Sequence, residues 1–452
     1  MANSFLNELL QTLTDRGRGL LGRSRGAPAA ANLVSLGEQL LSGRGEASGV
    51  ALATLLLEGY TAAPSKSRLS FLTALAEKFG PEPAKVEAAI AAYREAPSQT
   101  SLHALHIAAE PPRQELMRRL NHAPGGTAAL VRIREDLLGH VAAAPALQAV
   151  DEDFVHLFTS WFNRGFLVLR PIDWTTPANI LERIIRYEAV HRIRGWEDLR
   201  RRLEPADRRC FAFFHPRLVD EPLIFVEVAL TREIPEAIAP LLAAESTPLP
   251  AEEATTAVFY SISNTQRGLA GVSFGSFLIK QVVEDLQRSL PNLRNFVTLS
   301  PVPGFAAWLQ QQRKADGESE FLDEAARASL AGLEDPAWTE DAEKAEALRR
   351  PLLSAAAYYF LKAKTPSGLP VDSVARFHLR NGARLERINF MADLSRRGLD
   401  QAHGLMANYL YDLDQIEKNH EAFAAEGRFI TSAGVRKLML TPAAPRRRGS
   451  SS

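Results

Sequence analysis

Three glycines, Gly268, Gly271 and Gly275, lie in a short polar loop directly before a stretch with the spacing of an amphipathic helix. Glycine has no Cβ atom, so the backbone N–H groups beside it can turn closely toward an anion. The first turn of a helix adds unpaired N–H groups and the positive end of the helix dipole. The loop is therefore a candidate cradle for a pyrophosphate group, although many glycine-rich loops are only turns.

The elements around this loop determine what it can position. Residues 257–262 before it and 296–300 after the helix have the composition of strands, and the apolar residues of the helix share one face. A strand–loop–helix–strand unit with such a cradle also describes the coenzyme A site of the N-acetyltransferase fold, with a right-handed crossover if the strands are parallel. Ser300 falls at the carboxyl end of the second strand, where ligands of such sheets bind.

The whole chain divides by its periodicity. Residues 1–150 carry apolar residues at helical spacing without a strand signal, which predicts an all-α domain, a helical bundle. In residues 151–441 short β-prone runs alternate with helical segments, which predicts a mixed α+β or α/β domain. Residues 442–452, which are rich in arginine, proline and serine, are expected to form a disordered tail.

Composition excludes several classes of protein. Lys plus Arg equals Asp plus Glu at 53 each, so no basic surplus indicates a nucleic-acid partner, and the cluster of Arg446, Arg447 and Arg448 is interpreted as part of a solvated tail. No apolar run reaches the ~18 residues that a membrane span needs, and no signal peptide is evident. The single cysteine, Cys210, lies in an apolar run, which predicts a buried thiol and fits a reducing compartment.

Isolated polar residues carry little information by themselves. His103 and His106 are spaced to share a helix face, but two ligands without a third do not make a metal site, and we predict no metal. Taken alone, Ser300 would be a turn serine before a proline and His378 a strand histidine. Tyr411 is explained equally well as a core aromatic.

A series of sequence runs, which follow one another along nearly the whole chain, favours a functional interpretation of these residues instead. Residues 299–305 read LSPVPGF and residues 377–382 read FHLRNG, and further such runs are 124–127, 161–166, 188–191, 259–263, 271–275, 278–283 and 404–409. Together they resemble the malonyl-CoA decarboxylase family. The resemblance implies an N-terminal helical domain and then a catalytic domain of the N-acetyltransferase fold, the same mixed class that the periodicity predicts.

The resemblance also implies the site residues. The family's catalytic serine and histidine match Ser300 and His378, and a tyrosine near its site matches Tyr411. A glutamate that some members carry in their coenzyme A loop is a serine here, which leaves open whether this position takes part in the reaction. The loop maps onto seven consecutive residues: Ala270, Gly271, Val272, Ser273, Phe274, Gly275 and Ser276.

The implied reaction is that of a carboxy-lyase, which converts malonyl-CoA to acetyl-CoA and carbon dioxide through a thioester enolate. The enolate needs hydrogen-bond donors at its oxygen and a proton at its carbon. His378 suits the proton donor because imidazole titrates near neutral pH, and Ser300 is expected to bind the malonyl carboxyl group and orient His378. No cofactor is needed beyond the coenzyme A of the substrate, and no Gly-x-Ser-x-Gly elbow of a hydrolase surrounds Ser300.

Two alternatives stay open. An acyl-CoA N-acyltransferase would share the fold and the coenzyme A loop but needs an amine acceptor, and a coenzyme A-binding regulator would bind without turnover. The resemblance implies a homo-oligomer, for which the helical domain is the expected surface. Some family members are peroxisomal and end in Ser-Lys-Leu, whereas this chain ends in three serines, so we expect a soluble cytoplasmic protein. The bias of the chain toward Ala, Arg, Leu and Pro favours a bacterial source.

Overall fold

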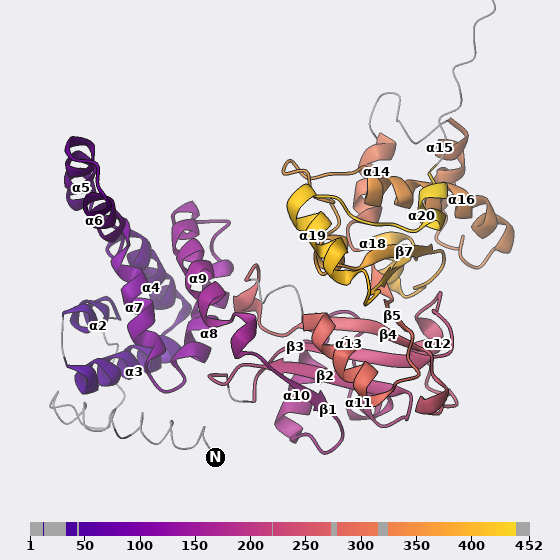
Figure 1. Ribbon diagram of the computed structural model, residues 1–452, viewed down its shortest axis with the longest axis horizontal. Coiled ribbons are helices and arrows are strands. Elements are labelled where there is room, and N and C mark those ends of the chain that lie inside the picture. The colour runs from indigo at the N-terminus through magenta and orange to yellow at the C-terminus, as the bar shows by residue number, and fades with distance from the viewer. Residues whose placement is uncertain are drawn as a thin grey trace, which may run out of the picture. The chain divides into compact units, whose positions relative to one another are not determined.

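The structure is a computed structural model that describes Thr12 and residues 33–42, 45–218, 220–272, 278–314 and 324–439. The chain divides into two compact units, and Figure 1 traces their elements. Unit 1 contains Met1–Val168, Phe213–Leu223 and Thr265–Gly275, and unit 2 contains Leu169–Ala212, Ile224–Asn264 and Ser276–Ser452. The predicted tail, residues 442–452, lies outside the described residues.

The N-terminal part of unit 1 is helical. Leu52, Leu56 and Leu72 are completely buried between its helices, as the helical spacing of apolar residues predicts. Helix α9 crosses residue 150, and the predicted domain boundaries at 150 and 441 stay predictions. The helices are α2 (Leu33–Leu41), α3 (Glu46–Ala62), α4 (Ser65–Glu77), α5 (Pro83–Glu95), α6 (Gln99–Ala109), α7 (Pro112–Asn121), α8 (Gly126–Leu138) and α9 (Gln148–Trp161).

A mixed sheet follows, in the order β1-β2-β3-β4-β5-β8-β6, with β7 paired to β8. β3 and β4 are antiparallel, whereas β4 and β5 are parallel and are joined by helix α13 (Leu278–Ser289). The sequence left the direction of these two strands open, and the structure shows them parallel. The predicted class, helices followed by a mixed α/β domain, is confirmed. The strands are β1 (Val168–Ile172), β2 (Arg208–Phe214), β3 (Pro222–Thr231), β4 (Thr256–Asn264), β5 (Asn295–Thr298), β6 (Ser300–Pro301), β7 (Arg384–Asn389) and β8 (Met406–Leu410).

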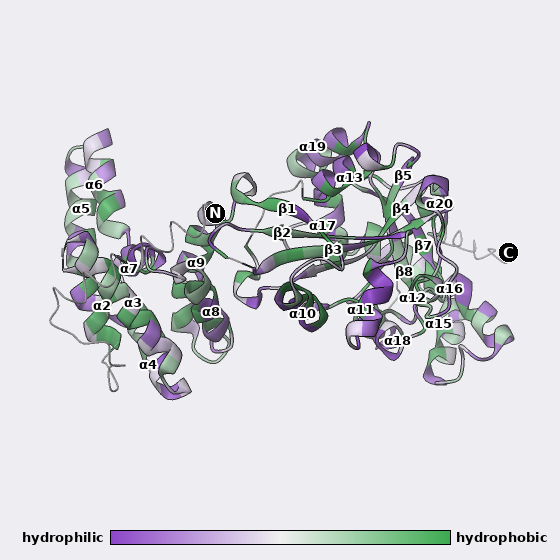
Figure 2. Cartoon of the chain, turned by 90° about the horizontal axis from the view of Figure 1, so that it is seen from below, coloured by the Kyte–Doolittle hydropathy of each residue, from purple (hydrophilic) through white to green (hydrophobic). Residues whose placement is uncertain are grey.

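Helices of unit 2 alternate with the strands along the chain, and Figure 2 shows hydrophobic residues along the strands. Most residues of β2, β3 and β4 are buried, as their apolar composition favours. These helices are α10 (Ala178–Tyr187), α11 (Trp196–Leu203), α12 (Ala239–Leu242), α13, α14 (Phe305–Lys314), α15 (Glu324–Leu330), α16 (Ala342–Leu361), α17 (Ser373–Arg380), α18 (Arg396–Ala402), α19 (Ile416–Glu426) and α20 (Ala433–Lys437).

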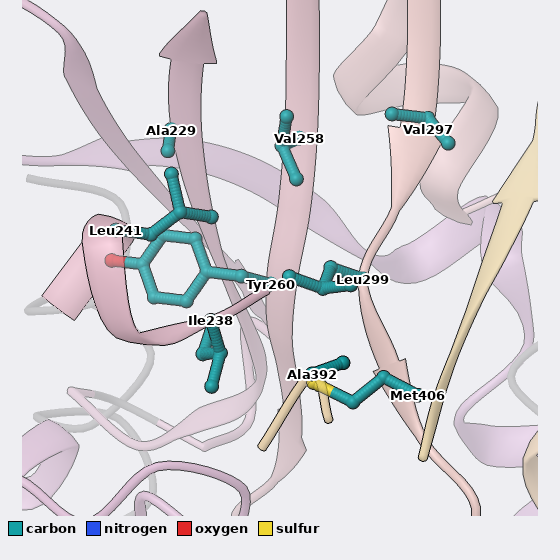
Figure 3. Packing of buried hydrophobic residues seen from close by; sticks show 9 residues of the cluster. All are labelled: Ala229, Ile238, Leu241, Val258, Tyr260, Val297, Leu299, Ala392 and Met406. Atoms are coloured by element: carbon teal, nitrogen blue, oxygen red, sulfur yellow. The ribbon is translucent and has the colours of Figure 1, made fainter. Parts of the chain in front are cut away.

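One face of the central strands forms a hydrophobic core that also orients the polar residues of those strands. Val258 and Tyr260 of β4 pack there against Val297 of β5 and against Leu299, which follows β5 (Figure 3). Successive side chains of a strand point to opposite faces. Because Leu299 enters this core, its neighbours Thr298 and Ser300 lie on the other face.

Two expectations about single residues have clear outcomes. Cys210 is 3% exposed, so its prediction as a buried thiol is confirmed, and burial raises its pKa well above the ordinary value. His378, taken alone, was interpreted as a strand histidine, and this is wrong because it lies in helix α17. Across the ranges described above, no helix is both long and apolar enough to cross a membrane.

Candidate active site

Helix α17, which carries His378, begins at a buried carboxylate. Asp372 precedes the helix, and its Oδ1 accepts a hydrogen bond from the backbone N–H of Ala375 at 2.7 Å, as an N-cap does. The Tyr359 hydroxyl of α16 donates to Asp372 Oδ2 at 3.3 Å. Asp372 is 1% exposed, and burial raises the pKa of its carboxyl to about 6. The cap therefore fixes the start of the helix that presents His378.

The imidazole of His378 lies between the two other predicted site residues. Its Nε2 is 3.1 Å from Ser300 Oγ, and its Nδ1 is 2.8 Å from the Tyr411 hydroxyl. The ring stacks on Tyr409, with 4.6 Å between centroids and 25° between planes. The structure thus brings Ser300, His378 and Tyr411 into one hydrogen-bonded group, although they come from β6, α17 and the residue after β8.

A fourth residue, Thr298, extends this group. The Ser300 hydroxyl donates to Thr298 Oγ1 at 2.8 Å, which also accepts the backbone N–H of Tyr409 at 3.2 Å. We call Tyr411, His378, Ser300 and Thr298 the hydroxyl–imidazole row. The sequence reasoning missed Thr298, although two residues of spacing from Ser300 in a strand would have placed it on the same face.

Burial makes the row electrically neutral. Ser300 is 6% exposed and His378 2%, and burial lowers the pKa of the His378 imidazole to about 3. Burial also raises the pKa of the Tyr411 phenol well above its ordinary value. The ordinary pKa of imidazole, on which the choice of His378 as proton donor was based, therefore does not apply in the protein without substrate, because removing an imidazolium from water disfavours the charged form.

The backbone behind the row is held by two asparagines. Asn408 of β8 donates from Nδ2 to the carbonyl oxygen of Thr298 at 2.8 Å, and Asn389 of β7 donates to Asn408 Oδ1 at the same distance. Asn408 is completely buried, so its amide has no water to replace these partners. The two amides therefore fix β5 against β8 at the point where the row crosses between them.

Only part of the predicted coenzyme A loop is described, since Ser273, Phe274, Gly275 and Ser276 lie outside the described residues. Ala270, Gly271 and Val272 follow a short helix of Arg267–Leu269, and Gly271 has a φ of +77°, which L side chains rarely adopt. A Cβ atom on Gly268 would lie 1.9 Å from the carbonyl oxygen of Val131 in α8. Gly268 thus allows the close contact with α8, and Gly271 the turn.

A buried arginine of α8 holds the described part of this loop. Arg134 donates from Nη1 to the carbonyl oxygens of Gly268 and Ala270, both at 2.8 Å. Its Nε donates to Asp151 Oδ1 at 2.8 Å, and the arginine is 2% exposed. The guanidinium is therefore paired with Asp151 while it holds the carbonyl groups of two loop residues.

A second polar group is buried elsewhere in the sheet. Arg202 of α11 pairs with Glu227 of β3 at 2.8 Å, and Glu188 accepts hydrogen bonds from the hydroxyls of Ser261 and Ser263 of β4. Glu227 is completely buried, and burial raises its pKa to about 7 despite the arginine. We call these five residues the ion-pair cluster. The cluster contains one arginine and two glutamates, whereas the hydroxyl–imidazole row contains no guanidinium or carboxylate.

Nothing in the described ranges offers a cluster of three or more His, Cys, Asp or Glu residues that could hold a metal ion. His103 and His106 both lie on α6 and are exposed. The predicted absence of a metal or cofactor stays a prediction.

Comparison with known proteins identifies the family. A family model described as the malonyl-CoA decarboxylase C-terminal domain matches residues 165–449, and one described as the malonyl-CoA decarboxylase N-terminal domain matches residues 79–162. The chain belongs to the malonyl-CoA decarboxylase family. The resemblance seen in the sequence motifs is thereby confirmed over both parts of the chain.

Solved structures of the family have the same fold. Malonyl-CoA decarboxylase from Rhodopseudomonas palustris is 62% identical, with a TM-score of 0.88 over 90% of this chain and 99% of that chain. The protein of that name from Agrobacterium vitis is 58% identical, with a TM-score of 0.86 over 91% and 100% of the two chains. The mitochondrial malonyl-CoA decarboxylase of Anser anser anser is 36% identical over 79% of this chain and 76% of its own length.

Proposed function

We propose that this member of the malonyl-CoA decarboxylase family is a carboxy-lyase that converts malonyl-CoA to acetyl-CoA and carbon dioxide, with Ser300 and His378 as its catalytic residues. The observation that carries the proposal is the buried Ser300–His378 contact of 3.1 Å, inside the region that the C-terminal family model matches. Tyr411, 2.8 Å from the other ring nitrogen, orients the imidazole.

The reaction consumes one proton in each turnover. The bond between the carboxylate carbon and C2 of the malonyl group breaks, carbon dioxide leaves, and the electron pair remains as the thioester enolate. C2 then takes a proton to give acetyl-CoA. A site for this chemistry must stabilise the enolate oxygen with hydrogen-bond donors and supply that proton.

Because the pKa of His378 is low in the free protein, we propose that the bound substrate is needed to protonate its imidazole. The free protein keeps the imidazole neutral. A malonyl carboxylate beside it raises the imidazole pKa, because a nearby negative charge favours the cation. His378 then takes a proton from solvent and delivers it to C2, while the Ser300 hydroxyl, which donates to Thr298 in the free protein, turns to donate to the departing carboxylate. The proton is thus held only when there is a substrate to receive it.

We further propose that the loop of residues 270–276 binds the pyrophosphate of coenzyme A. Gly271 lets the backbone turn at a positive φ, and Arg134 orients the carbonyl groups of Gly268 and Ala270. These contacts hold the described beginning of the loop in place. Beyond the coenzyme A of the substrate the reaction requires no cofactor, since enolate formation needs only donors and a proton.

The test is to give the purified protein malonyl-CoA alone and to measure acetyl-CoA and carbon dioxide. We expect both products in equal amounts without any amine, and much less from a His378→Gln preparation made in the same way. Release of free coenzyme A only when an amine is added would support the N-acyltransferase. Tight binding of malonyl-CoA without products would support the regulator.

The helical unit contains a candidate surface for self-association, which we propose joins copies of this chain. Among the described residues, no side chain of α5 or α6 is buried, and Leu102 and Ile107 are 45% and 59% exposed. Figures 1 and 2 show the two helices as a projecting pair with hydrophobic residues on their surface. The two helices pack against each other without burying a side chain, so a second copy of the chain is the expected cover.

Light scattering after size-exclusion chromatography tests this surface. Leu102→Glu with Ile107→Glu should lower the mass of the particle, whereas Leu394→Glu, at a 48% exposed residue of unit 2, should not. An unchanged mass in the double variant would place the interface elsewhere. A cytoplasmic location stays a prediction, which fractionation of cells that make the protein tests.

A further inference from the structure

The hydrogen bonds of the hydroxyl–imidazole row have a direction. The Ser300 hydroxyl has a single hydrogen, and the geometry of its contact with Thr298 Oγ1 is that of a bond donated by Ser300. The Ser300 oxygen can then only accept from His378 Nε2, 3.1 Å away. A neutral imidazole carries one hydrogen, so this hydrogen lies on Nε2 and the bare Nδ1 accepts from the Tyr411 hydroxyl at 2.8 Å.

We infer that Thr298 is a positioning residue of this site: by accepting the Ser300 hydroxyl hydrogen, it keeps the hydrogen of the neutral His378 imidazole on Nε2. The catalytic consequence rests on the proposed function, but the assignment of the hydrogen does not. Neither the family match nor the motifs in the sequence assign a role to Thr298.

The position of Thr298 is fixed by its contacts, so it can accept the Ser300 hydroxyl hydrogen in one direction. It is completely buried, and Oγ1 also accepts the backbone N–H of Tyr409, which can only donate. Its carbonyl oxygen accepts from Asn408, so backbone and side chain are both fixed on β8. A hydroxyl acceptor fixed in this way leaves Ser300 one low-energy direction for its hydrogen.

The direction matters for the reaction. In a serine hydrolase the serine hydroxyl donates to the imidazole, which removes its proton and makes the oxygen a nucleophile. Here the imidazole donates to the serine, so the resting site does not activate Ser300 for attack on the thioester. Thr298 thereby favours protonation of the enolate, with a hydrogen on Nε2, over hydrolysis of malonyl-CoA to free coenzyme A.

The tautomer is measured directly in the free protein by two-bond ¹H–¹⁵N correlation spectra after ¹⁵N labelling of histidine, since these distinguish a protonated ring nitrogen from a bare one. The chain has ten histidines, and the signals of His378 are those lost in His378→Gln. We expect Nε2–H in the unsubstituted protein. An Nδ1–H form there would overturn the inference, whatever any variant does.

Substitution of Thr298 tests whether this residue determines the tautomer of His378. Thr298→Val removes the acceptor at nearly constant volume, so the Ser300 hydrogen should turn to Nε2 and the imidazole hydrogen should move to Nδ1. We expect kcat for malonyl-CoA to fall about 10–100-fold, as for loss of a group that orients a catalytic ligand, with KM unchanged. Thr298→Ser keeps the hydroxyl and should restore both the tautomer and kcat.

Thr256→Val is the matched control, since Thr256 is also completely buried in the sheet and its Oγ1 accepts from Asn295 Nδ2 at 3.2 Å. It should change neither the tautomer nor kcat. A Thr298→Val protein with unchanged tautomer and kcat would overturn the inference, and if that variant fails to fold, Thr298→Ser and the unsubstituted protein still decide it. A protein that shows Nε2–H but no decarboxylation would contradict the proposed function alone.

Discussion

Two polar groups are buried in the same mixed sheet, and burial shifts the pKa of a base in one and of an acid in the other in opposite directions. The hydroxyl–imidazole row contains no charge in the free protein, because burial lowers the pKa of His378 to about 3. The ion-pair cluster contains Arg202 beside Glu227, whose pKa burial raises to about 7. The neutral imidazole of His378 can take up a proton when the substrate binds, whereas Glu227 already has a charged partner in Arg202. The proposed function assigns the reaction to the row, and we expect the cluster to contribute to stability instead.

The largest expected effect is on turnover, in the row. His378→Gln keeps most of the ring's volume but removes the proton donor, so kcat for malonyl-CoA should fall by about 10²–10⁴-fold. The thermal unfolding transition should remain cooperative. Steady-state kinetics and calorimetry on one preparation check both statements, and near-normal turnover in a folded variant would remove His378 from the mechanism.

The next effect is on stability, in the cluster. Arg202→Ala leaves Glu227 buried without its partner, and such losses cost about 3–5 kcal/mol of unfolding free energy. The double variant Arg202→Met with Glu227→Leu should recover much of this loss. Denaturant unfolding measures the free energies, and kcat of the folded fraction should stay normal. If Arg202→Ala abolished turnover without loss of stability, the division between row and cluster would be wrong.

The pH dependence of stability should have opposite signs in the two groups. The His378 imidazole has its pKa lowered from 6.5 to about 3, so its contribution is present above pH 6.5 and is lost as the pH falls toward 3. The Glu227 carboxyl has its pKa raised from 4.5 to about 7, so its contribution is present below pH 4.5 and is lost as the pH rises toward 7.

Unfolding free energies between pH 4.5 and 6.5 test this reversal. Relative to the unsubstituted protein, His378→Gln should remove a term that rises by up to about 1.4 kcal/mol per pH unit, and Glu227→Gln a term that falls by as much. Equal pH slopes in both variants would show that burial does not hold the two groups in opposite protonation states.

The smallest expected effect is on substrate affinity, in the loop beside Arg134. Gly271→Val forces an L residue to a φ of +77° and crowds the proposed pyrophosphate cradle, so KM for malonyl-CoA should rise about tenfold, or about 1.4 kcal/mol. Gly427→Val is the matched control, since Gly427 follows α19 at a φ of +61° with open space around it. Equal KM values in the two variants would show that the pyrophosphate does not bind at this loop.

The sequence predicted what local pattern determines. Helical spacing predicted the N-terminal helices, and strand composition on both sides of a helical segment predicted β4 and β5, which the structure shows to be parallel. Ser300, His378 and Tyr411 came from motifs, and the structure brings them together. Asp372 had a readable signal, since an aspartate three residues before Ala375 at a helix start is a common N-cap pattern.

What the sequence did not predict depends on contacts between distant residues. The pKa of His378 is set by burial among α17, β6 and β8, which no local pattern reports. The contact of Arg134 with Gly268 joins residues 134 positions apart. Thr298 was missed because a threonine in a strand is ordinary. Its role follows only from the direction of one hydrogen bond, which depends on how Ser300 and Tyr409 are placed around it.

The most direct test of the central claim is the kcat of Ser300→Ala measured against that of Ser261→Ala. Both serines are buried in the same sheet, at 6% and 1% exposed, one in the row and one bound to Glu188 of the cluster. We predict that kcat for malonyl-CoA falls about 10²-fold in Ser300→Ala and stays normal in Ser261→Ala. Normal turnover in Ser300→Ala, or an equal loss in both variants, would contradict the assignment of the reaction to the hydroxyl–imidazole row.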